Sequence, residues 1–107
     1  MRPHPNLVSF QGICIQGKDV FLVFEYVAWG DLWSYLTKNE IEQSKQYSLL
    51  HGIASGMLHL SSEALIHRDL AARNVLLTQL LEPKITDFVC CFFLKFFLIN
   101  QFFKSTF

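Results

Sequence analysis

The stretch Ile66–Leu77, I-H-R-D-L-A-A-R-N-V-L-L, and its continuation Lys84–Phe88, K-I-T-D-F, decide how this 107-residue chain is interpreted. Val75–Leu77 and Lys84–Thr86 are short apolar or β-branched runs, and the residues between them include a glutamate and a proline. This pattern predicts two antiparallel strands around a turn centred near positions 80 and 81.

Folding about that centre predicts that Asn74 faces Asp87 across the strand pair, at a separation of about 5 Å. Asp69 lies five residues before Asn74, in the loop that leads into the first strand, so a third oxygen-bearing side chain can reach the same space. Amide and carboxylate oxygens suit Mg²⁺, which prefers one or two carboxylates and completes its shell with phosphate oxygens. The spacing therefore predicts a magnesium site at the mouth of the strand pair.

The same stretch resembles the catalytic loop of the protein kinases. The eight residues from His67 to Asn74 match the pattern H-R-D-L-x-x-x-N, and Asp87-Phe88 matches the first two letters of D-F-G. The insert A-A-R at positions 71–73 is similar to the variant found in the tyrosine-specific branch of the family. Without the resemblance, the stretch is a polar loop with one buried histidine and some surface charge.

The resemblance implies a role for each polar residue of the loop. Asp69 accepts the proton of the substrate hydroxyl, and Arg73 helps to place the substrate tyrosine. Asn74 and Asp87 hold Mg²⁺ on the phosphates of ATP. A protein substrate that presents a tyrosine is the implied partner.

Two apolar runs precede this stretch. Leu7–Ile15 and Val20–Val27 flank the turn residues Gln16–Asp19, and this arrangement predicts a β-hairpin. The hairpin resembles the last two strands of the smaller, N-terminal lobe of a kinase domain. Taken alone, the second run is simply a buried strand.

The end of the second run resembles the hinge between the two kinase lobes, with the sequence E-Y-V at positions 25–27. The resemblance implies that the backbone of Glu25 and of Val27 hydrogen-bonds the adenine of ATP. Phe24 then guards the back of the nucleotide pocket, and Leu76 completes the implied nucleotide-binding residues.

Two helices are expected between the hairpin and the catalytic stretch. Asp31 is a good N-cap for a short helix over Leu32–Lys38. A longer helix is expected over about Gln43–Ser61, and Gly52 and Gly56 inside it predict close packing, because each costs up to about 1 kcal/mol relative to alanine. Residues at three- and four-residue steps predict its buried apolar stripe: Tyr47, Leu50, Ala54, Met57, Leu58 and Ser61.

Composition limits the classes of protein and partner. Nine basic and nine acidic residues give no net charge, so neither a nucleic-acid nor an anionic-membrane partner is expected. The three cysteines, Cys14, Cys90 and Cys91, have no metal-ligand spacing; they fit a reducing compartment and are interpreted mainly as small apolar residues. The expected location is cytoplasmic, either as a cytosolic protein or as the intracellular part of a receptor. His51 and His59 are interpreted as ordinary helix residues and not as metal ligands.

The resemblance ends at Phe88, so we expect a partial kinase domain over residues 1–88 and an unrelated tail over 89–107. Val89 stands where the kinase pattern has the glycine of D-F-G, which predicts a perturbed loop. Eight of the eleven phenylalanines lie in residues 88–107. We hypothesise that the tail, from Val89 onward, is translated intron or an equivalent gene-model or splice error. The competing interpretation is a membrane span, but Lys95 leaves apolar runs far shorter than the roughly twenty residues required.

These patterns predict an α+β fold that comprises the end of the N-lobe sheet, the hinge and part of the mainly helical C-lobe. The 107 residues contain no G-x-G-x-x-G, no lysine before Leu7 and no A-P-E, so we expect no measurable catalysis from the chain as written. The alternatives are a truncated pseudokinase that acts as a binding module, and a non-functional product of intron read-through. Whether the parent kinase is a receptor or a cytosolic enzyme is left open.

Overall fold

The structure is a computed structural model, and it describes residues 2–88. Two strands, β1 (Phe10–Gln16) and β2 (Asp19–Phe24), are followed by the helices α1 (Leu32–Lys38) and α2 (Gln43–Ser62). A single 3₁₀ turn, η1 (Ala72–Asn74), then leads into β3 (Val75–Leu77) and β4 (Pro83–Ile85). The described residues therefore form two two-stranded antiparallel sheets and two helices, and the expected α+β class is confirmed. The expected tail, including Val89, lies outside the described residues.

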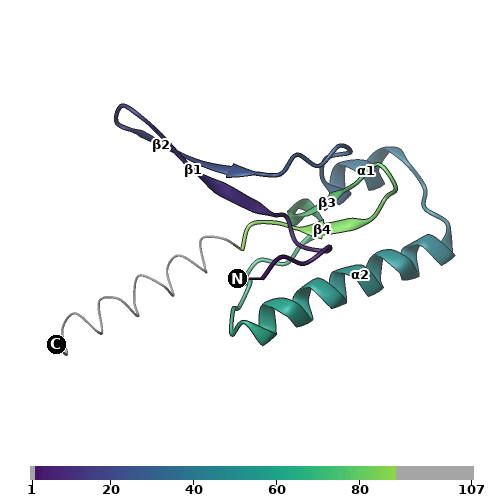
Figure 1. Cartoon of the computed structure of the whole chain (residues 1–107). Coiled ribbons are helices and arrows are strands. Elements are labelled where there is room, and N and C mark those ends of the chain that lie inside the picture. Colours follow the sequence, from purple (N-terminus) through teal and green to yellow (C-terminus); the bar gives the residue numbers. More distant parts are fainter. Residues whose placement is uncertain (1, 89–107) are drawn as a thin grey trace.

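The first sheet is a hairpin that extends away from the rest of the described chain (Figure 1). Gln16 pairs with Asp19, so only Gly17 and Lys18 form the turn, and Gly17 adopts the positive φ of 63° that glycine permits. The predicted strand from Leu7 is too long, because β1 begins at Phe10. The residues before β1 are used elsewhere: the Val8 N–H donates to the carbonyl of Ile85 at 2.9 Å.

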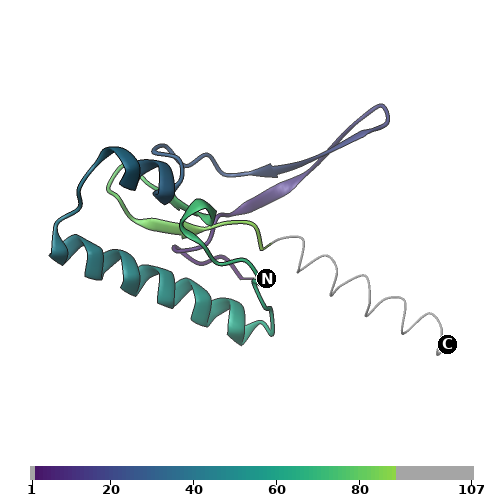
Figure 2. The same cartoon turned by 180° about the vertical axis from the view of Figure 1, so that it is seen from behind.

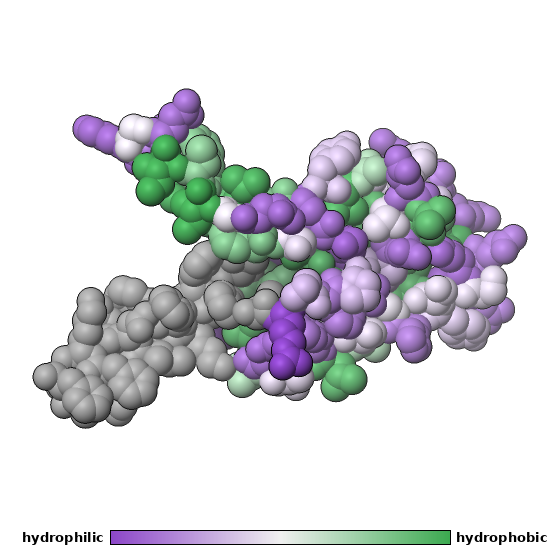
Figure 3. All heavy atoms as spheres, in the orientation of Figure 1, coloured by the Kyte–Doolittle hydropathy of each residue, from purple (hydrophilic) through white to green (hydrophobic). Residues whose placement is uncertain are grey.

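Apolar side chains cover the hairpin on both faces and remain in contact with solvent. Figure 3 shows apolar residues gathered on the face of the extended arm that is in view. Every residue of β2 is exposed, although its sequence is typical of a strand buried on both faces. The exposed large apolar residues of the two strands are Ile13, Ile15, Val20, Phe21, Leu22, Val23 and Phe24.

Helix α1 begins and ends where the sequence predicts. Asp31 caps its N-terminus by accepting from the Ser34 N–H at 2.9 Å and from the Ser34 hydroxyl at 2.8 Å. The helix packs against η1 and β3, with Leu32 as its buried residue. It therefore connects the segment after the hairpin to the second sheet.

Helix α2 has the predicted bounds to within one residue, but its predicted apolar stripe is wrong except at Met57, which packs against the core. The buried residues are Leu49, Gly52, Gly56 and Leu60, whereas Tyr47, Leu50 and Leu58 are exposed. The helix buries its glycine face because that face allows other segments to approach closely. A Cβ at Gly52 would lie 2.5 Å from Pro83 Cγ, and one at Gly56 would lie 2.9 Å from both the carbonyl oxygen of Asn6 and Ile85 Cδ1. The close packing expected at these glycines is confirmed.

The hydrophobic core lies between α2 and the second sheet, with α1 at its edge (Figures 1 and 2). An N-terminal segment, residues 2–8, also contributes: Leu7 is buried and forms a parallel bridge with Ile85. The core consists of residues from every part of the described chain except the hairpin: Leu7, Leu32, Leu49, Leu60, Leu65, Val75, Leu77, Ile85 and Phe88. The core thus packs against β3 and β4, whereas of the hairpin only Phe10, at the start of β1, packs against it.

Candidate functional site

The site is built around a buried histidine that joins the loop after α2 to the end of β4. His67 is only 3% exposed. Its Nδ1 accepts from the Asp69 N–H at 3.1 Å, and its Nε2 lies 2.7 Å from the carbonyl oxygen of Thr86. Because an amide N–H only donates and a carbonyl only accepts, this geometry assigns the proton to Nε2. His67 thereby fixes the backbone on both sides of the site.

The carboxylate of Asp69 is exposed and is held by two neighbours. Arg73 Nη2 lies 2.5 Å from its Oδ1, and Asn74 Nδ2 donates to its Oδ2 at 3.2 Å and to its carbonyl oxygen at 2.9 Å. The hydrogen bond from Arg73 is the main cause that lowers the pKa of Asp69; slight desolvation opposes it, and the Arg73 charge and Asn74 add to the lowering. Asp69 therefore presents an ionised carboxylate at neutral pH, oriented by Arg73 and Asn74.

The strand pair brings Asn74 opposite Thr86 and not opposite Asp87, so the predicted register is wrong by one residue. Val75 pairs with Ile85, and the Thr86 N–H donates to the carbonyl oxygen of Asn74 at 2.9 Å. The connecting loop comprises residues 78–82 and is centred on position 80, half a residue earlier than predicted.

Thr78 closes that loop and explains the register. Its N–H donates to the Glu82 carbonyl at 3.0 Å, and its hydroxyl accepts from the Glu82 N–H at 3.0 Å. Leu81 adopts a φ of 58°, a left-handed conformation that is uncommon for leucine. The sequence carries no glycine or asparagine in this loop, so the usual signal for a positive φ was absent.

Asp87 lies one residue beyond the paired end of β4. It has a φ of 67°, and its exposed carboxylate is flanked by Thr86, which is bonded on both sides, and by Phe88, which is 1% exposed. Arg68, in the loop of Asp69, has a φ of 72°. Positive φ values at two non-glycine residues of one site are typical of functional segments that the surrounding structure holds in place.

The residues predicted to bind a nucleotide lie on two neighbouring elements. Phe24 ends β2 and packs edge-on against Phe10, and Val27 is buried in the segment after β2. Leu76, half-buried at the centre of β3, pairs with Lys84 and forms an isolated bridge with Asp31. The segment after β2 is tied to β3 by the Trp29 N–H, which donates to the Leu77 carbonyl at 3.0 Å.

Glu25 and Lys84 form an ion pair that the sequence did not predict. Lys84 Nζ lies 2.8 Å from Glu25 Oε1, and the same oxygen accepts from the Ser9 N–H at 2.9 Å. Burial raises the pKa of Glu25, but the hydrogen bonds from Lys84 and Ser9 outweigh it and leave the pKa below its usual value. Alternation along β4 predicts that Lys84 points away from the core, but it gives no signal for a partner 59 residues away.

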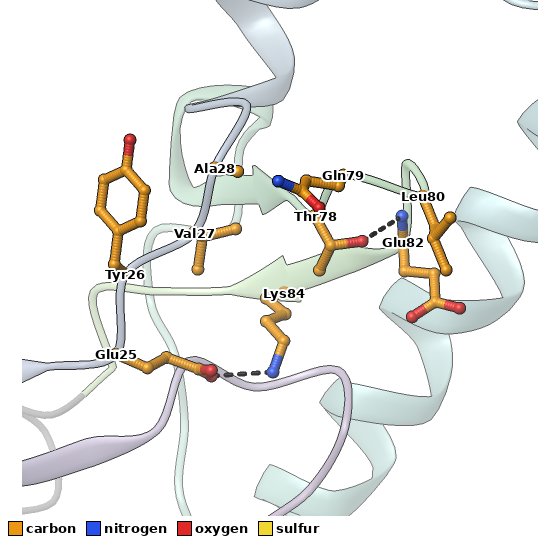
Figure 4. A pocket seen from close by; sticks show the side chains of 9 residues that line it. All are labelled: Glu25, Tyr26, Val27, Ala28, Thr78, Gln79, Leu80, Glu82 and Lys84. Atoms are coloured by element: carbon orange, nitrogen blue, oxygen red, sulfur yellow. Dashed lines mark hydrogen bonds and ion pairs between the residues drawn. The ribbon is translucent and has the colours of Figure 1, made fainter.

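A cavity of about 440 Å³ opens between the segment after β2 and the β3–β4 loop (Figure 4). The Glu25 and Lys84 pair lines one side, and the contact between Thr78 and Glu82 lies at the other. It includes Glu25 and Val27 but neither Phe24 nor Leu76, and it contains none of Asp69, Asn74 and Asp87. This cavity therefore does not join the predicted nucleotide-binding residues to the predicted metal ligands.

Within residues 2–88 no three histidine, cysteine, aspartate or glutamate side chains gather as a metal site. A pair made of one asparagine and one aspartate would not meet this criterion of three side chains. Binding of Mg²⁺ by Asn74 and Asp87 therefore stays a prediction. None of the helices in the same range has the length and apolar character needed to cross a membrane.

Comparisons with known proteins agree with the motifs. A model of the family "Protein tyrosine and serine/threonine kinase" matches residues 1–94. Ephrin type-A receptor 5 of Gallus gallus is 41% identical over 87 residues, which cover 79% of this chain and 9% of that protein. The BDNF/NT-3 growth factors receptor of Gallus gallus is 36% identical over 99 residues, covering 79% of this chain and 12% of the receptor.

The chain thus spans about a tenth of the length of the curated relatives it matches. The match includes the catalytic loop, β3, β4 and the segment after β2, so the resemblance found in the motifs is confirmed across the described residues. The chain belongs to the protein tyrosine and serine/threonine kinase family, as a fragment of a tyrosine kinase domain.

Proposed function

We propose that this chain carries the catalytic loop and the metal-binding strand pair of a domain that transfers the γ-phosphoryl group of ATP to protein tyrosine. The observation that carries the proposal is the clamped carboxylate of Asp69, held by Arg73 at 2.5 Å and by Asn74 at 3.2 Å. Phosphoryl transfer depends chiefly on positioning and charge stabilisation, so a preoriented acceptor for the hydroxyl proton is what this chemistry requires.

Asp69 accepts the tyrosine hydroxyl proton as the oxygen attacks phosphorus. Arg73 occupies one oxygen of that carboxylate, which leaves the other oxygen, shared only with the longer contact from Asn74, to face the substrate. The guanidinium also places positive charge beside the incoming tyrosine. Arg73 is thus assigned to substrate placement and to orienting the base.

Asn74 and Asp87 suit Mg²⁺ by donor chemistry. The amide nitrogen of Asn74 is committed to Asp69, so its amide oxygen is the atom available to a cation. Asp87 presents an exposed carboxylate on a backbone whose neighbours are fixed. Mg²⁺ bound there supplies charge neutralisation on the ATP phosphates.

The segment from Phe24 to Val27, with Leu76 below it, is assigned to the adenine of ATP. In residues 2–88 the Glu25 N–H is bonded to the Ser9 carbonyl, whereas the chain makes no use of the Glu25 carbonyl or the Val27 N–H. These two free backbone groups form one acceptor and one donor, which is the complement of an adenine edge. The ion pair of Glu25 with Lys84 keeps this backbone in place.

A transplant tests the catalytic assignment. Residues 64–88 replace the equivalent stretch of an active tyrosine kinase domain, and transfer of phosphate from Mg-ATP to a poly-Glu/Tyr peptide is measured. We expect activity in the chimera, a loss of at least about a hundredfold with Asp69→Asn, and no change with the control Gln79→Glu in the exposed β3–β4 loop. An inactive chimera that still folds, or an Asp69→Asn chimera of undiminished rate, contradicts the proposal.

We further propose that the 107-residue chain alone is inactive, because it contains no G-x-G-x-x-G and no lysine before Leu7 to clamp the phosphates. A second candidate function, a non-catalytic binding module, is favoured by the apolar hairpin exposed on both faces. Binding of the purified chain to an intact tyrosine kinase domain, lost with Phe21→Ser, supports the module; no binding by either protein argues for a product without function.

A cytoplasmic location, as a soluble kinase or as the intracellular part of a receptor, follows from the need for ATP. ATP and a protein tyrosine are the proposed partners. Fractionation of cells that express the chain, with a cytosolic and a secreted marker, tests the location.

A further inference from the structure

A pair of histidines fastens the N-terminal segment to the end of α2. The rings of His4 and His59 lie with their centroids 5.0 Å apart. His59 Nε2 also lies 3.0 Å from the carbonyl oxygen of Arg2, and His4 Nε2 lies 3.3 Å from the Ser55 hydroxyl. Three contacts between residues 2–4 and one face of α2 therefore depend on imidazole rings.

The neutral form of His4 completes a turn. Its Nδ1 accepts from the Asn6 N–H at 3.0 Å, while its carbonyl accepts from the Leu7 N–H at 3.1 Å. A protonated imidazole has no acceptor, so it loses the bond to Asn6 and places two donors where one is used. The same assignment puts the proton of neutral His4 on Nε2, directed at Ser55, so this serine is not activated as a nucleophile.

The turn positions the segment that packs between α2 and β4. Beyond it, the Val8 N–H donates to the Ile85 carbonyl at 2.9 Å and the Ile85 N–H donates to the Asn6 carbonyl at 2.8 Å. The backbone of Asn6 fits against Gly56, and its side chain donates to the Pro83 carbonyl at 2.9 Å. Leu7 and Val8 are each 3% exposed, so release of the segment would expose core residues.

The charged groups around His4 set the direction of the effect. On α2, His59 faces it directly, Glu63 lies 3.7 Å from His59 Nε2, and His51 lies two turns before His59. On the other side, Glu25 and Lys84 line a cavity of about 280 Å³ with His4, and they are paired with each other. The main chain of Arg2 meets both His59 and Glu63, through its carbonyl at 3.0 Å and its N–H at 3.4 Å.

We propose that His4 and His59 form an acid-sensitive clasp, which holds residues 2–8 between α2 and β4 at neutral pH and releases them when the His4 ring is protonated. The centroids of the two rings are 5.0 Å apart, so a charge on His4 would lie directly against the His59 ring, and Glu63 lies 3.7 Å from His59 Nε2. Burial, and then the proximity of His59, lower the pKa of His4. A lowered pKa in the folded state means that the unfolded or released segment binds the proton more readily, so the closed clasp is favoured above about pH 6.5 and is lost as the pH falls below it.

Hydrogen exchange of the 107-residue chain, followed by NMR and corrected for intrinsic rates, tests the clasp. Between about pH 7.5 and pH 5.5 we expect the protection of the Val8 and Ile85 amides to fall about tenfold or more. The Thr86 amide, which is bonded to Asn74 outside the segment, should keep its protection. An equal fall at Thr86 reports general unfolding and overturns the proposal, as does a flat profile at Val8.

Variants separate the clasp from other titrating groups. His4→Asn keeps a side-chain acceptor for the Asn6 N–H, as in an Asx-turn, but its side chain does not titrate in this pH range. In this variant the protection of the Val8 amide should be the same at both pH values. The matched control His51→Gln should show the same fall in protection as the wild type. A fall of unchanged size in His4→Asn contradicts the assignment. If that variant fails to fold, the wild-type ring signals decide: titration of His4 with no coincident shift of the Asn6 and Val8 amides also contradicts it.

Discussion

The β3–β4 strand pair and the N-terminal hairpin are both two-stranded antiparallel sheets, yet only the β3–β4 pair contributes fully buried residues to the core. Val75, Leu77 and Ile85 of the strand pair are at most 2% exposed, whereas Ile15 and Val20 of the hairpin are 73% and 63% exposed. The hairpin has the longer ladder and the larger number of apolar residues. Pairing and hydrophobicity alone therefore do not determine where a sheet lies; burial against α2 and the N-terminal segment does.

The sharpest contrast comes from the same substitution in each sheet. Ile85→Ala removes a fully buried side chain and should lower the free energy of unfolding by about 2 to 5 kcal/mol, because it loses apolar burial and leaves a cavity. Ile15→Ala removes a side chain that is 73% exposed and should change the free energy of unfolding by less than about 0.5 kcal/mol. Urea unfolding of both variants measures the difference. Similar losses in the two would show that the hairpin is buried in solution.

A substitution on the glycine face of α2 should have the next largest effect on stability. Gly56→Ala improves helix propensity but places a methyl group 2.9 Å from the Asn6 carbonyl oxygen and Ile85 Cδ1. We expect a net destabilisation of about 1 to 3 kcal/mol from overpacking. The matched change Ala54→Gly, on the exposed side of α2, should cost only about 1 kcal/mol through propensity. Thermal unfolding followed by circular dichroism compares them, and a stabilised Gly56→Ala would refute this packing.

These two comparisons show what the sequence predicts and what it does not. The Asp31 cap and both bounds of α1 follow from local signals, and so do the approximate ends of α2. The buried face of α2 does not, because Tyr47, Leu50 and Leu58 have the more apolar side chains while Gly52 and Gly56 have the closer neighbours. Those neighbours, Asn6 and Pro83, lie far away in the sequence.

The site shows the same division. The eight-residue motif identified Asp69, Arg73 and Asn74, and the structure brings these three together. The register of β3 and β4 was missed by one residue because Thr78 closes the loop with its own hydroxyl. The ion pair of Glu25 with Lys84 was missed because the two residues are 59 positions apart, and no local pattern indicates that the fold brings them together.

Loss of the Glu25–Lys84 ion pair should lower the free energy of unfolding moderately. Lys84→Met leaves the partly buried Glu25 with only the Ser9 N–H as partner, and should cost about 1 kcal/mol at pH 7. Because the folded-state pKa of Glu25 is lowered, this contribution is present above about pH 4.5 and disappears as the pH falls further. The unfolding free energies of wild type and Lys84→Met should therefore converge in acid. Lys18→Met, at the hairpin turn, is the control and should show no such difference.

The smallest effect concerns the titration of Asp69. Arg73→Gln removes the hydrogen bond that most lowers the pKa of this carboxyl, so the pKa should rise toward its usual value. The carboxylate's contribution to stability is present above the ordinary aspartate pKa and is lost as the pH falls through the lowered one. Carbon-detected NMR titration of the side chain measures the shift, with Arg68→Gln as the control. An unchanged Asp69 pKa in Arg73→Gln would contradict the claim that Arg73 holds this carboxylate in its ionised form.

Paramagnetic broadening by Mn²⁺-ATP, with Mn²⁺ in place of Mg²⁺, tests the metal site most directly. On the ¹⁵N-labelled chain, the account predicts that the amides of Asn74, Thr86 and Asp87 broaden first, and that Asp87→Asn abolishes the effect while leaving the spectrum of the hairpin unchanged. Broadening that begins at Glu63 or Glu82, or that persists unaltered in Asp87→Asn, would contradict the assignment of Asn74 and Asp87 as the metal ligands.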